Sequence, residues 1–219
     1  MVDLARTKFS SLQYCDFIYK APDKGGRLFL FLHGYMQKAY TIYNKFESLI
    51  KPGDGILAPN GAYPIPVKVK DNWKHGYSWY FYNPNTREYP IDTDVAVSFI
   101  KTLLNEKNLN EHKITAIGFS QGGYLTPYLA QNIPQIDHII GMACEFKTNR
   151  LDEGKRFDFR ADQVHGGCDD LVNIEHAKET HRAILKLGAR GSFIEFPEEK
   201  HEYCDVFISK VVEFMQLTD

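Results

Sequence analysis

The sequence has no strongly charged segment of one sign. Its 219 residues include 26 Lys and Arg against 28 Asp and Glu, which gives a formal net charge of −2, and basic residues form no run. A nucleic-acid-binding face needs clustered cations that replace the counterions of the phosphate backbone. We therefore expect no nucleic-acid partner.

The start of the sequence also lacks a long apolar run. Residues 1–10 contain Asp3, Arg6 and Lys8 and no long apolar core, so they resemble neither a secretory signal nor a membrane span. We expect no stable insertion into a membrane, and the cytoplasm is the expected compartment. Nothing in the sequence indicates an oligomeric state.

Cysteine is scarce and is not arranged for metal binding. Cys15, Cys144, Cys168 and Cys204 form no Cys-x-x-Cys pair and have no ligand-like spacing with histidine. We expect no metal site, and in a cytoplasmic protein the thiols should stay reduced. The even number of cysteines leaves a secreted, disulfide-bonded form as the alternative.

The apolar content is sufficient for one hydrophobic core. Apolar residues make up 43% of the chain and charged residues 25%, and the length suits a single domain over residues 1–219. Apolar runs alternate with amphipathic stretches, which is typical of an α/β fold with a mainly parallel sheet flanked by helices on both faces. The strands are predicted at residues 14–19, 27–32, 55–58, 113–118, 138–143, 159–165 and 192–196.

Two stretches depart from this regular alternation. A turn-rich segment, residues 21–26, separates the first two strands, so the sheet should open with an antiparallel hairpin. Residues 60–90 are dense in aromatic side chains, proline and asparagine, and we predict a long ordered loop there. Its rings either wall an apolar pocket or anchor the loop to the core. Residues 144–158 are too few for a separate lid domain.

Apolar periodicity predicts two particular helices. Asp92 or Thr93 can cap a helix in which Val95, Phe99 and Leu103 recur every four residues. The closing helix should bury one apolar face, formed by Phe207, Val211, Phe214 and Met215.

The segment Gly118-Phe119-Ser120-Gln121-Gly122 has the Gly-x-Ser-x-Gly pattern of a nucleophile elbow. It follows an apolar strand and precedes a predicted helix, which is the context that this motif requires. An elbow strains the backbone of its serine and brings strand and helix close together, so Gly118 and Gly122 must lack bulk. The alternative is a glycine-rich turn with an incidental serine.

A serine nucleophile needs a base, and the base needs an orienting carboxylate. A polar turn after the strand at 159–165 contains Asp169 and Asp170, and His201 follows the last strand. The order serine, acid, histidine is that of α/β-hydrolases. Both carboxylates are candidates, because sequence alone does not show which one faces the imidazole. The other histidines, expected to be turn, surface or helix positions without an acidic partner, are His33, His75, His112, His138, His165, His176 and His181.

From about Phe29 onward the chain resembles the phospholipase/carboxylesterase branch of the α/β-hydrolases, which includes the acyl-protein thioesterases. The resemblance rests on Leu32-His33-Gly34, Ser78-Trp79, Gly118 to Gly123, His165 to Val172 and the isolated His201. It implies an α/β-hydrolase fold with the catalytic triad Ser120, Asp169 and His201. It also implies an oxyanion hole made by the backbone N–H groups of Tyr35 and Gln121, and it places Trp79 near the acyl group of the substrate.

Several residues depart from the family pattern near these motifs, among them Asp170 and Asn173, which stand where prolines are usual, and Tyr80-Phe81, which replaces a usual Phe-Asp. Met36 stands where the family usually has a second glycine, and Pro127 should remove a backbone hydrogen bond and kink the helix after the nucleophile. We hypothesise that Met36 and the rings near Trp79 contact the substrate, shorten the acyl groove and favour small esters.

The sequence thus predicts a serine hydrolase that cleaves a small-molecule carboxylic ester or thioester through an acyl-enzyme on Ser120. Such chemistry needs no metal and no organic cofactor. The alternatives are an acyl-protein thioesterase or lysophospholipase acting on long acyl chains, a serine peptidase, and a catalytically silent protein that keeps the fold as a ligand-binding site.

Overall fold

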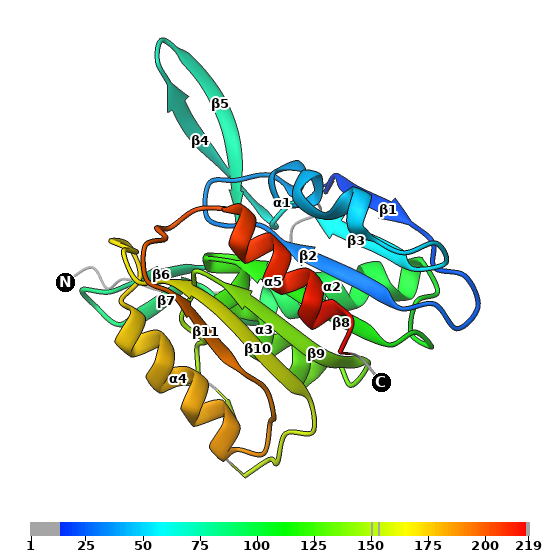
Figure 1. Cartoon of the computed structure of the whole chain (residues 1–219). Helices are drawn as coiled ribbons and strands as arrows, with labels where there is room; N and C mark the ends of the chain where they lie inside the picture. The colour runs from blue at the N-terminus through cyan, green and yellow to red at the C-terminus, as the bar shows by residue number, and fades with distance from the viewer. Residues whose placement is uncertain (1–13, 150, 153, 218–219) are drawn as a thin grey trace, which may run out of the picture.

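The predicted strands assemble into one seven-stranded sheet in the computed structural model, which describes residues 14–149, 151–152 and 154–217. In spatial order the strands are β1 (Phe17–Lys20), β3 (Gly55–Pro59), β2 (Leu28–Leu32), β8 (Ile114–Phe119), β9 (Ile136–Met142), β10 (Arg160–Gly166) and β11 (Phe193–Phe196) (Figure 1). All neighbouring pairs are parallel except β1 with β3. The predicted mainly parallel sheet is confirmed, while residues 1–10 lie outside the described residues.

The predicted opening hairpin is wrong. β1 is antiparallel, but it pairs with β3, and β2 lies on the other side of β3 and runs parallel to it. Burial explains this order, because every residue of β2 and β3 is buried while β1 is only partly covered. Two fully buried strands belong side by side in the centre of a sheet, which leaves β1 at the edge.

Helices cover both faces of the sheet (Figure 1). On one face, α1 (Ala39–Phe46) and α5 (Asp205–Met215) share a core that contains Ile42 and Phe207. The core on the other face contains Ile100 of α2 (Thr93–Glu106), Leu125 of α3 (Gln121–Asn132) and Ile184 of α4 (Ile174–Lys186). A short 3₁₀ helix, η1 (Glu47–Leu49), follows α1. This arrangement is the predicted α/β-hydrolase architecture.

Both helices that the apolar periodicity predicted are present, but their buried faces agree with the prediction to different degrees. Asp92 caps α2, because its Oδ1 accepts a hydrogen bond from Asp94 N at 3.2 Å. The predicted apolar stripe of α2 is confirmed at Leu103, which is buried, and at Phe99, which packs against the core, but it is wrong at Val95, which is exposed. The buried residues of α2 are Thr93, Ala96, Val97, Ile100, Leu103 and Leu104. The predicted face of α5 is confirmed, and it buries Phe207, Val211, Phe214 and Met215.

The prediction of one long loop over residues 60–90 is also wrong. This stretch forms two hairpins, β4 (Tyr63–Val69) with β5 (Asn72–Ser78) and β6 (Phe81–Asn83) with β7 (Glu88–Ile91). The β4–β5 hairpin projects from the rest of the fold as an arm (Figure 1). Pro64 and Pro66 are two residues apart and exposed in β4, so the positions without N–H can both face the free edge of the hairpin.

Helix α3 continues to Asn132 despite Pro127 in its interior. Pro127 has no N–H for the carbonyl of Gly123, but the hydroxyl of Thr126 donates to that oxygen at 2.9 Å. The hydrogen bond that the sequence expected to be lost is therefore replaced by a neighbouring side chain.

No insertion in the described part of the chain forms a separate lid domain over the sheet. Among the same residues, no helix combines the length and the apolar character needed to cross a bilayer.

Candidate active site

Ser120 lies at the sharp turn between β8 and α3. Its φ of 48° and ψ of −120° put a non-glycine residue in a strained region, as a nucleophile elbow requires. A Cβ on Gly118 would lie 2.4 Å from the carbonyl carbon of Gly122, and one on Gly122 would lie 2.2 Å from the carbonyl oxygen of Leu32. The prediction that both positions must lack bulk is confirmed.

Of the two candidate acids, Asp169 is the one that the structure places against His201. The Nδ1 of His201 lies 2.8 Å from Oδ2 of Asp169, and the Asp169 side chain is fully buried. A carboxylate accepts the hydrogen bond, so Nδ1 carries the imidazole proton and Nε2 has a free lone pair. Asp170 is exposed, and the described part of the chain holds no contact between it and His201.

The carboxylate of Asp169 is held in place by its own turn. Its Oδ1 accepts hydrogen bonds from the backbone N–H groups of Leu171, at 2.9 Å, and Val172, at 2.8 Å. His165, fully buried, lies with Nε2 at 3.1 Å from the carbonyl oxygen of Val172 and 3.4 Å from Oδ2 of Asp169. Burial lowers the pKa of His165, so its neutral ring donates from Nε2. His165 therefore has the acidic neighbour that the sequence did not predict.

The segment with His201 packs against the elbow through aromatic rings. The ring of Phe119, the residue before Ser120, lies 5.1 Å from the imidazole of His201 and 4.0 Å from the ring of Tyr203, measured between centroids. The hydrophobic contact of Phe119 thus brings the histidine segment to the nucleophile.

In the loop after β2, the backbone N–H groups on either side of Tyr35 are engaged in hydrogen bonds. Gly34 N donates to Oε1 of Gln37 at 2.9 Å, Met36 N donates to Tyr77 O at 3.0 Å, and Gln37 N donates to Gly34 O at 3.2 Å. No hydrogen bond between described residues uses the N–H of Tyr35.

The second predicted oxyanion donor is the N–H of Gln121, the first residue of α3. The N–H groups in the first turn of a helix have no acceptor within the helix, and the helix dipole favours negative charge there. Its side chain has a separate role, because Gln121 Nε2 donates to Tyr80 O at 2.9 Å while its Oε1 accepts from Trp79 N at 3.1 Å.

Met36 has a backbone conformation that suits the glycine usual in the family. Its φ is 63°, and the residue is 42% exposed. A left-handed conformation costs an ordinary residue about 1 kcal/mol. At Met36 the base of the β4–β5 arm packs backbone against backbone. The approach is so close that a Cβ on Gly76 would lie 2.0 Å from the carbonyl oxygen of Met36.

Trp79 is buried completely, so it has no surface to offer a substrate in this structure. Its indole Nε1 donates to His33 O at 2.8 Å, and its ring packs 4.9 Å from that of His33. His33 is held in turn, with Nδ1 2.7 Å from Gly34 O and Nε2 accepting from Gly61 N at 2.9 Å. Burial lowers the pKa of His33 to about 4, so the ring is neutral. Through these contacts, the rings of Trp79 and His33 hold the loop after β2 that contains Tyr35.

Gln37 is a part of the site that sequence reasoning missed. Its Oε1 accepts from Gly34 N and, at 2.9 Å, from the hydroxyl of Tyr203, so it connects the loop after β2 to the segment with His201. The contact joins residues 166 positions apart, and neither residue belongs to a motif. No local signal in the sequence indicates it.

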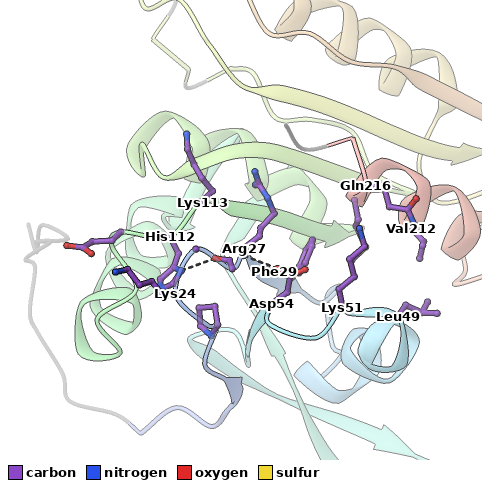
Figure 2. A pocket seen from close by; sticks show the side chains of 15 residues that line it. Lys24, Arg27, Phe29, Leu49, Lys51, Asp54, His112, Lys113, Val212 and Gln216 are labelled. Atoms are coloured by element: carbon purple, nitrogen blue, oxygen red, sulfur yellow. Dashed lines mark hydrogen bonds between the residues drawn. The ribbon is translucent and has the colours of Figure 1, made fainter.

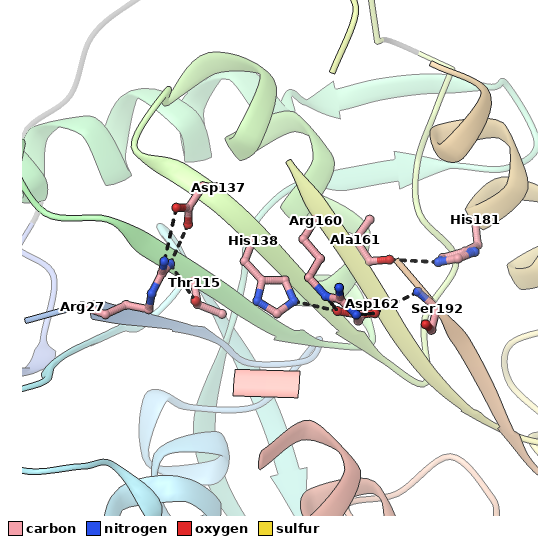
Figure 3. A network of polar contacts seen from close by, with 9 residues as sticks. All are labelled: Arg27, Thr115, Asp137, His138, Arg160, Ala161, Asp162, His181 and Ser192. Atoms are coloured by element: carbon pink, nitrogen blue, oxygen red, sulfur yellow. Dashed lines mark hydrogen bonds and ion pairs between the residues drawn. The ribbon is translucent and has the colours of Figure 1, made fainter. Parts of the chain in front are cut away.

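Two of the other histidines are buried: His138 lies in a strand and has an acidic partner, contrary to the prediction, while His181 lies in helix α4 without one, as predicted. His138 is 1% exposed and its Nε2 lies 2.9 Å from Oδ2 of Asp162, which also pairs with Arg160 (Figure 3). His181 is 3% exposed and bonds to Ala161 O at 3.0 Å. The polar group on β9 and β10 is a separate His–Asp pair, and no contact between described residues connects it to Ser120.

A cavity of about 1100 Å³ opens at the opposite end of the sheet (Figure 2). Its walls include Arg27, just before β2, and Lys113, just before β8, so it lies at the amino ends of these strands. Ser120, Asp169 and His201 do not line it. Among residues 14–149, 151–152 and 154–217, no three His, Cys, Asp or Glu side chains are gathered as ligands for a metal ion.

Comparisons with known proteins agree with this geometry. The model of the phospholipase/carboxylesterase family matches residues 13–219. Acyl-protein thioesterase 1 homolog 2 of Dictyostelium discoideum is 25% identical over 202 residues, which cover 85% of this chain and 90% of that protein. The fold is similar to that of YahD, solved with malic acid (TM-score 0.74, 16% identity, 94% of this chain and 100% of that one). It is also similar to that of acyl-protein thioesterase 2 of Zea mays (TM-score 0.72, 16% identity, 93% of this chain and 98% of that one). The chain therefore belongs to the phospholipase/carboxylesterase family of α/β-hydrolases and is a hydrolase of the esterase and thioesterase type.

Proposed function

We propose that this enzyme hydrolyses carboxylic ester or thioester bonds through an acyl-enzyme on Ser120. The observation that carries the proposal is the hydrogen bond between His201 and the buried carboxylate of Asp169, beside a strained elbow with Ser120 at its apex. We further propose that residues 1–219 form one domain, which acts in the cytoplasm on a small-molecule substrate without metal or cofactor.

In this mechanism His201 Nε2 takes the proton of Ser120 as the serine oxygen attacks the acyl carbon. Asp169 holds the imidazole in the required tautomer and stabilises the imidazolium that forms. His201 then returns the proton to the leaving alcohol or thiol. Water, activated by the same base, attacks the acyl-enzyme and releases the acid.

The N–H groups of Tyr35 and Gln121 would receive the negative charge that develops on the acyl oxygen. One such donor is worth about 3 kcal/mol in the transition state. Two features favour these donors, since neighbouring N–H groups of the loop are engaged elsewhere and Gln121 opens α3. Gln37 would keep this loop in register with the segment that contains His201.

A second candidate function is that of an acyl-protein thioesterase acting on long acyl chains; the name of the Dictyostelium relative favours acylated proteins as substrates. It uses the same chemistry and differs only in the acyl group and the leaving group. A palmitoyl-peptide thioester compared with short esters separates the two candidates.

The direct test is hydrolysis of p-nitrophenyl acetate and of a short acyl thioester by the enzyme and its Ser120→Ala variant. We expect measurable turnover by the unchanged enzyme and a loss of about 10⁴-fold or more in kcat for the variant. Circular dichroism should show the same fold for both proteins. Full activity in the variant would remove Ser120 from the mechanism, and a folded but inactive unchanged enzyme would favour the silent ligand-binding protein.

A further inference from the structure

The loop after β9 places a charged pair at the edge of the proposed active site. β9 lies between β8 and β10, whose carboxyl ends lead to Ser120 and Asp169. The loop therefore emerges between the proposed nucleophile and its acid. Ser120 N donates to Met142 O, the last residue of β9, at 2.9 Å. Lys147 and Glu145 follow within five residues.

Lys147 is a partly buried cation with a defined set of neighbours. Its Nζ lies 4.9 Å from the ring centroid of Tyr124 and 5.8 Å from that of Tyr82, and 3.4 Å from Oε1 of Glu145. Its side chain is only 20% exposed, and that of Glu145 is 26% exposed. Ring faces attract an ammonium group, so two rings and a carboxylate hold this charge in one place.

Tyr124 connects the pair to the proposed nucleophile. It lies one turn after Ser120 in α3, and its N–H donates to Ser120 O at 3.0 Å. The pKa of its hydroxyl is raised by burial and, to a smaller extent, by the carboxylates of Glu145 and Asp169. Tyr124, Lys147 and Glu145 therefore gather beside the turn that carries Ser120, where the loop after β9 leaves the sheet.

We propose that Lys147 is a specificity-determining residue that excludes long apolar acyl chains from this side of the site, so that the enzyme acts on short acyl groups. This inference rests on the proposed ester or thioester hydrolysis. An apolar chain laid against these side chains would remove the remaining water from the ammonium group and supply no hydrogen-bond acceptor in return. A buried methylene raises kcat/KM by at most about fourfold, so several are needed to offset that cost.

The test is an acyl-length profile of the unchanged enzyme and the Lys147→Met variant. Methionine keeps an unbranched side chain and removes the charge. With p-nitrophenyl esters of two to twelve carbons below their micelle-forming concentrations, we expect the unchanged enzyme to prefer four carbons or fewer. The variant should gain at least tenfold in kcat/KM on the octanoyl and decanoyl esters and stay within threefold on the acetyl ester.

Lys107→Met is the matched control. The Nζ of Lys107 lies 5.1 Å and 5.5 Å from the ring centroids of Phe17 and Tyr19, so it has the same kind of ring contact away from the proposed site. Its profile should equal that of the unchanged enzyme. An equal gain on long esters in this control would show a general effect of lost charge and overturn the assignment to Lys147.

A second variant keeps the inference testable if Lys147→Met does not fold. Glu145→Gln removes the partner of the ammonium group but leaves the charge, so activity on octanoyl and decanoyl esters should fall further relative to the acetyl ester. A gain there would overturn the inference.

Two further outcomes separate the inference from the proposed function. If the unchanged enzyme turns over esters and folded Lys147→Met has the same acyl-length profile, the role of Lys147 is refuted but the proposed function is not. A highest kcat/KM on long esters in the unchanged enzyme would also refute that role. A folded enzyme with no turnover of any ester or thioester would instead refute the proposed function, and the inference with it.

Discussion

Replacement of Asp169 by asparagine tests the choice between the two adjacent acids. In the folded enzyme the Oδ1 of Asp169 accepts from the N–H groups of Leu171 and Val172, and Oδ2 faces Nδ1 of His201 at 2.8 Å. An asparagine would keep its oxygen toward the two backbone donors and turn its NH₂ group toward His201. Two donors would then face each other, so the imidazole would change tautomer and place its proton on Nε2.

This tautomer cannot accept the proton of Ser120. Loss of the orienting carboxylate in a Ser-His-Asp triad costs about 10⁴ in kcat, which corresponds to about 5.5 kcal/mol. We expect a loss of this order for Asp169→Asn, with little change in KM. Asp170 is exposed and, among the described residues, has no contact with His201, so Asp170→Asn should stay within a few fold of the unchanged enzyme.

The assay is steady-state hydrolysis of p-nitrophenyl acetate by both variants, with thermal unfolding as a check on folding. A crippling loss in Asp170→Asn beside a mild effect in Asp169→Asn would refute the pairing described above. Mild effects in both variants would mean that His201 has another partner during turnover.

Three further outcomes follow from individual contacts. His33 stays neutral in the fold, with a pKa of about 4 against 6.5 for the free imidazole, and its protonation would break the bond from Gly61 N. Because the unfolded chain binds this proton first, the free energy of unfolding should fall as pH drops below 6.5, by about 2 kcal/mol at pH 5. A constant Tm between pH 7.5 and pH 5 would contradict this. Tyr203→Phe removes the hydroxyl that donates to Gln37, and this hydrogen bond contributes about 1 kcal/mol. We therefore expect kcat for ester hydrolysis to fall about fivefold with KM nearly constant. An unchanged kcat would remove this link from the mechanism. Trp79→Phe should lower Tm by about 2–8 °C through the lost indole hydrogen bond and volume, but leave the acyl-length profile unaltered; a changed profile would return Trp79 to the substrate-contacting surface.

The sequence predicted the features that depend on near neighbours. The apolar run of β8, the two glycines around Ser120 and the start of α3 lie within a few residues of one another, so their steric requirements are visible in the order of residues. The capping of α2 by Asp92 is local in the same way. Parallel strands also show as fully apolar runs, because both of their faces are covered.

Features that depend on distant partners were predicted poorly. The segment at 14–19 reads equally well as the partner of either neighbouring strand, and only competition for the buried centre of the sheet puts β1 beside β3. Pro64 and Pro66 argue against a strand unless its free edge is known. The burial of His138 is set by Asp162, 24 residues away, and no local pattern indicates it.

The central claim is that Ser120 is a nucleophile activated by His201, and covalent labelling tests it most directly. We expect a fluorophosphonate probe to add once to the protein, with the adduct on the peptide that contains Ser120 when the digest is analysed by mass spectrometry. Ser120→Ala should show no adduct, and His201→Gln should react far more slowly. Labelling at another residue, or a folded enzyme that does not react with the probe at all, would contradict the account.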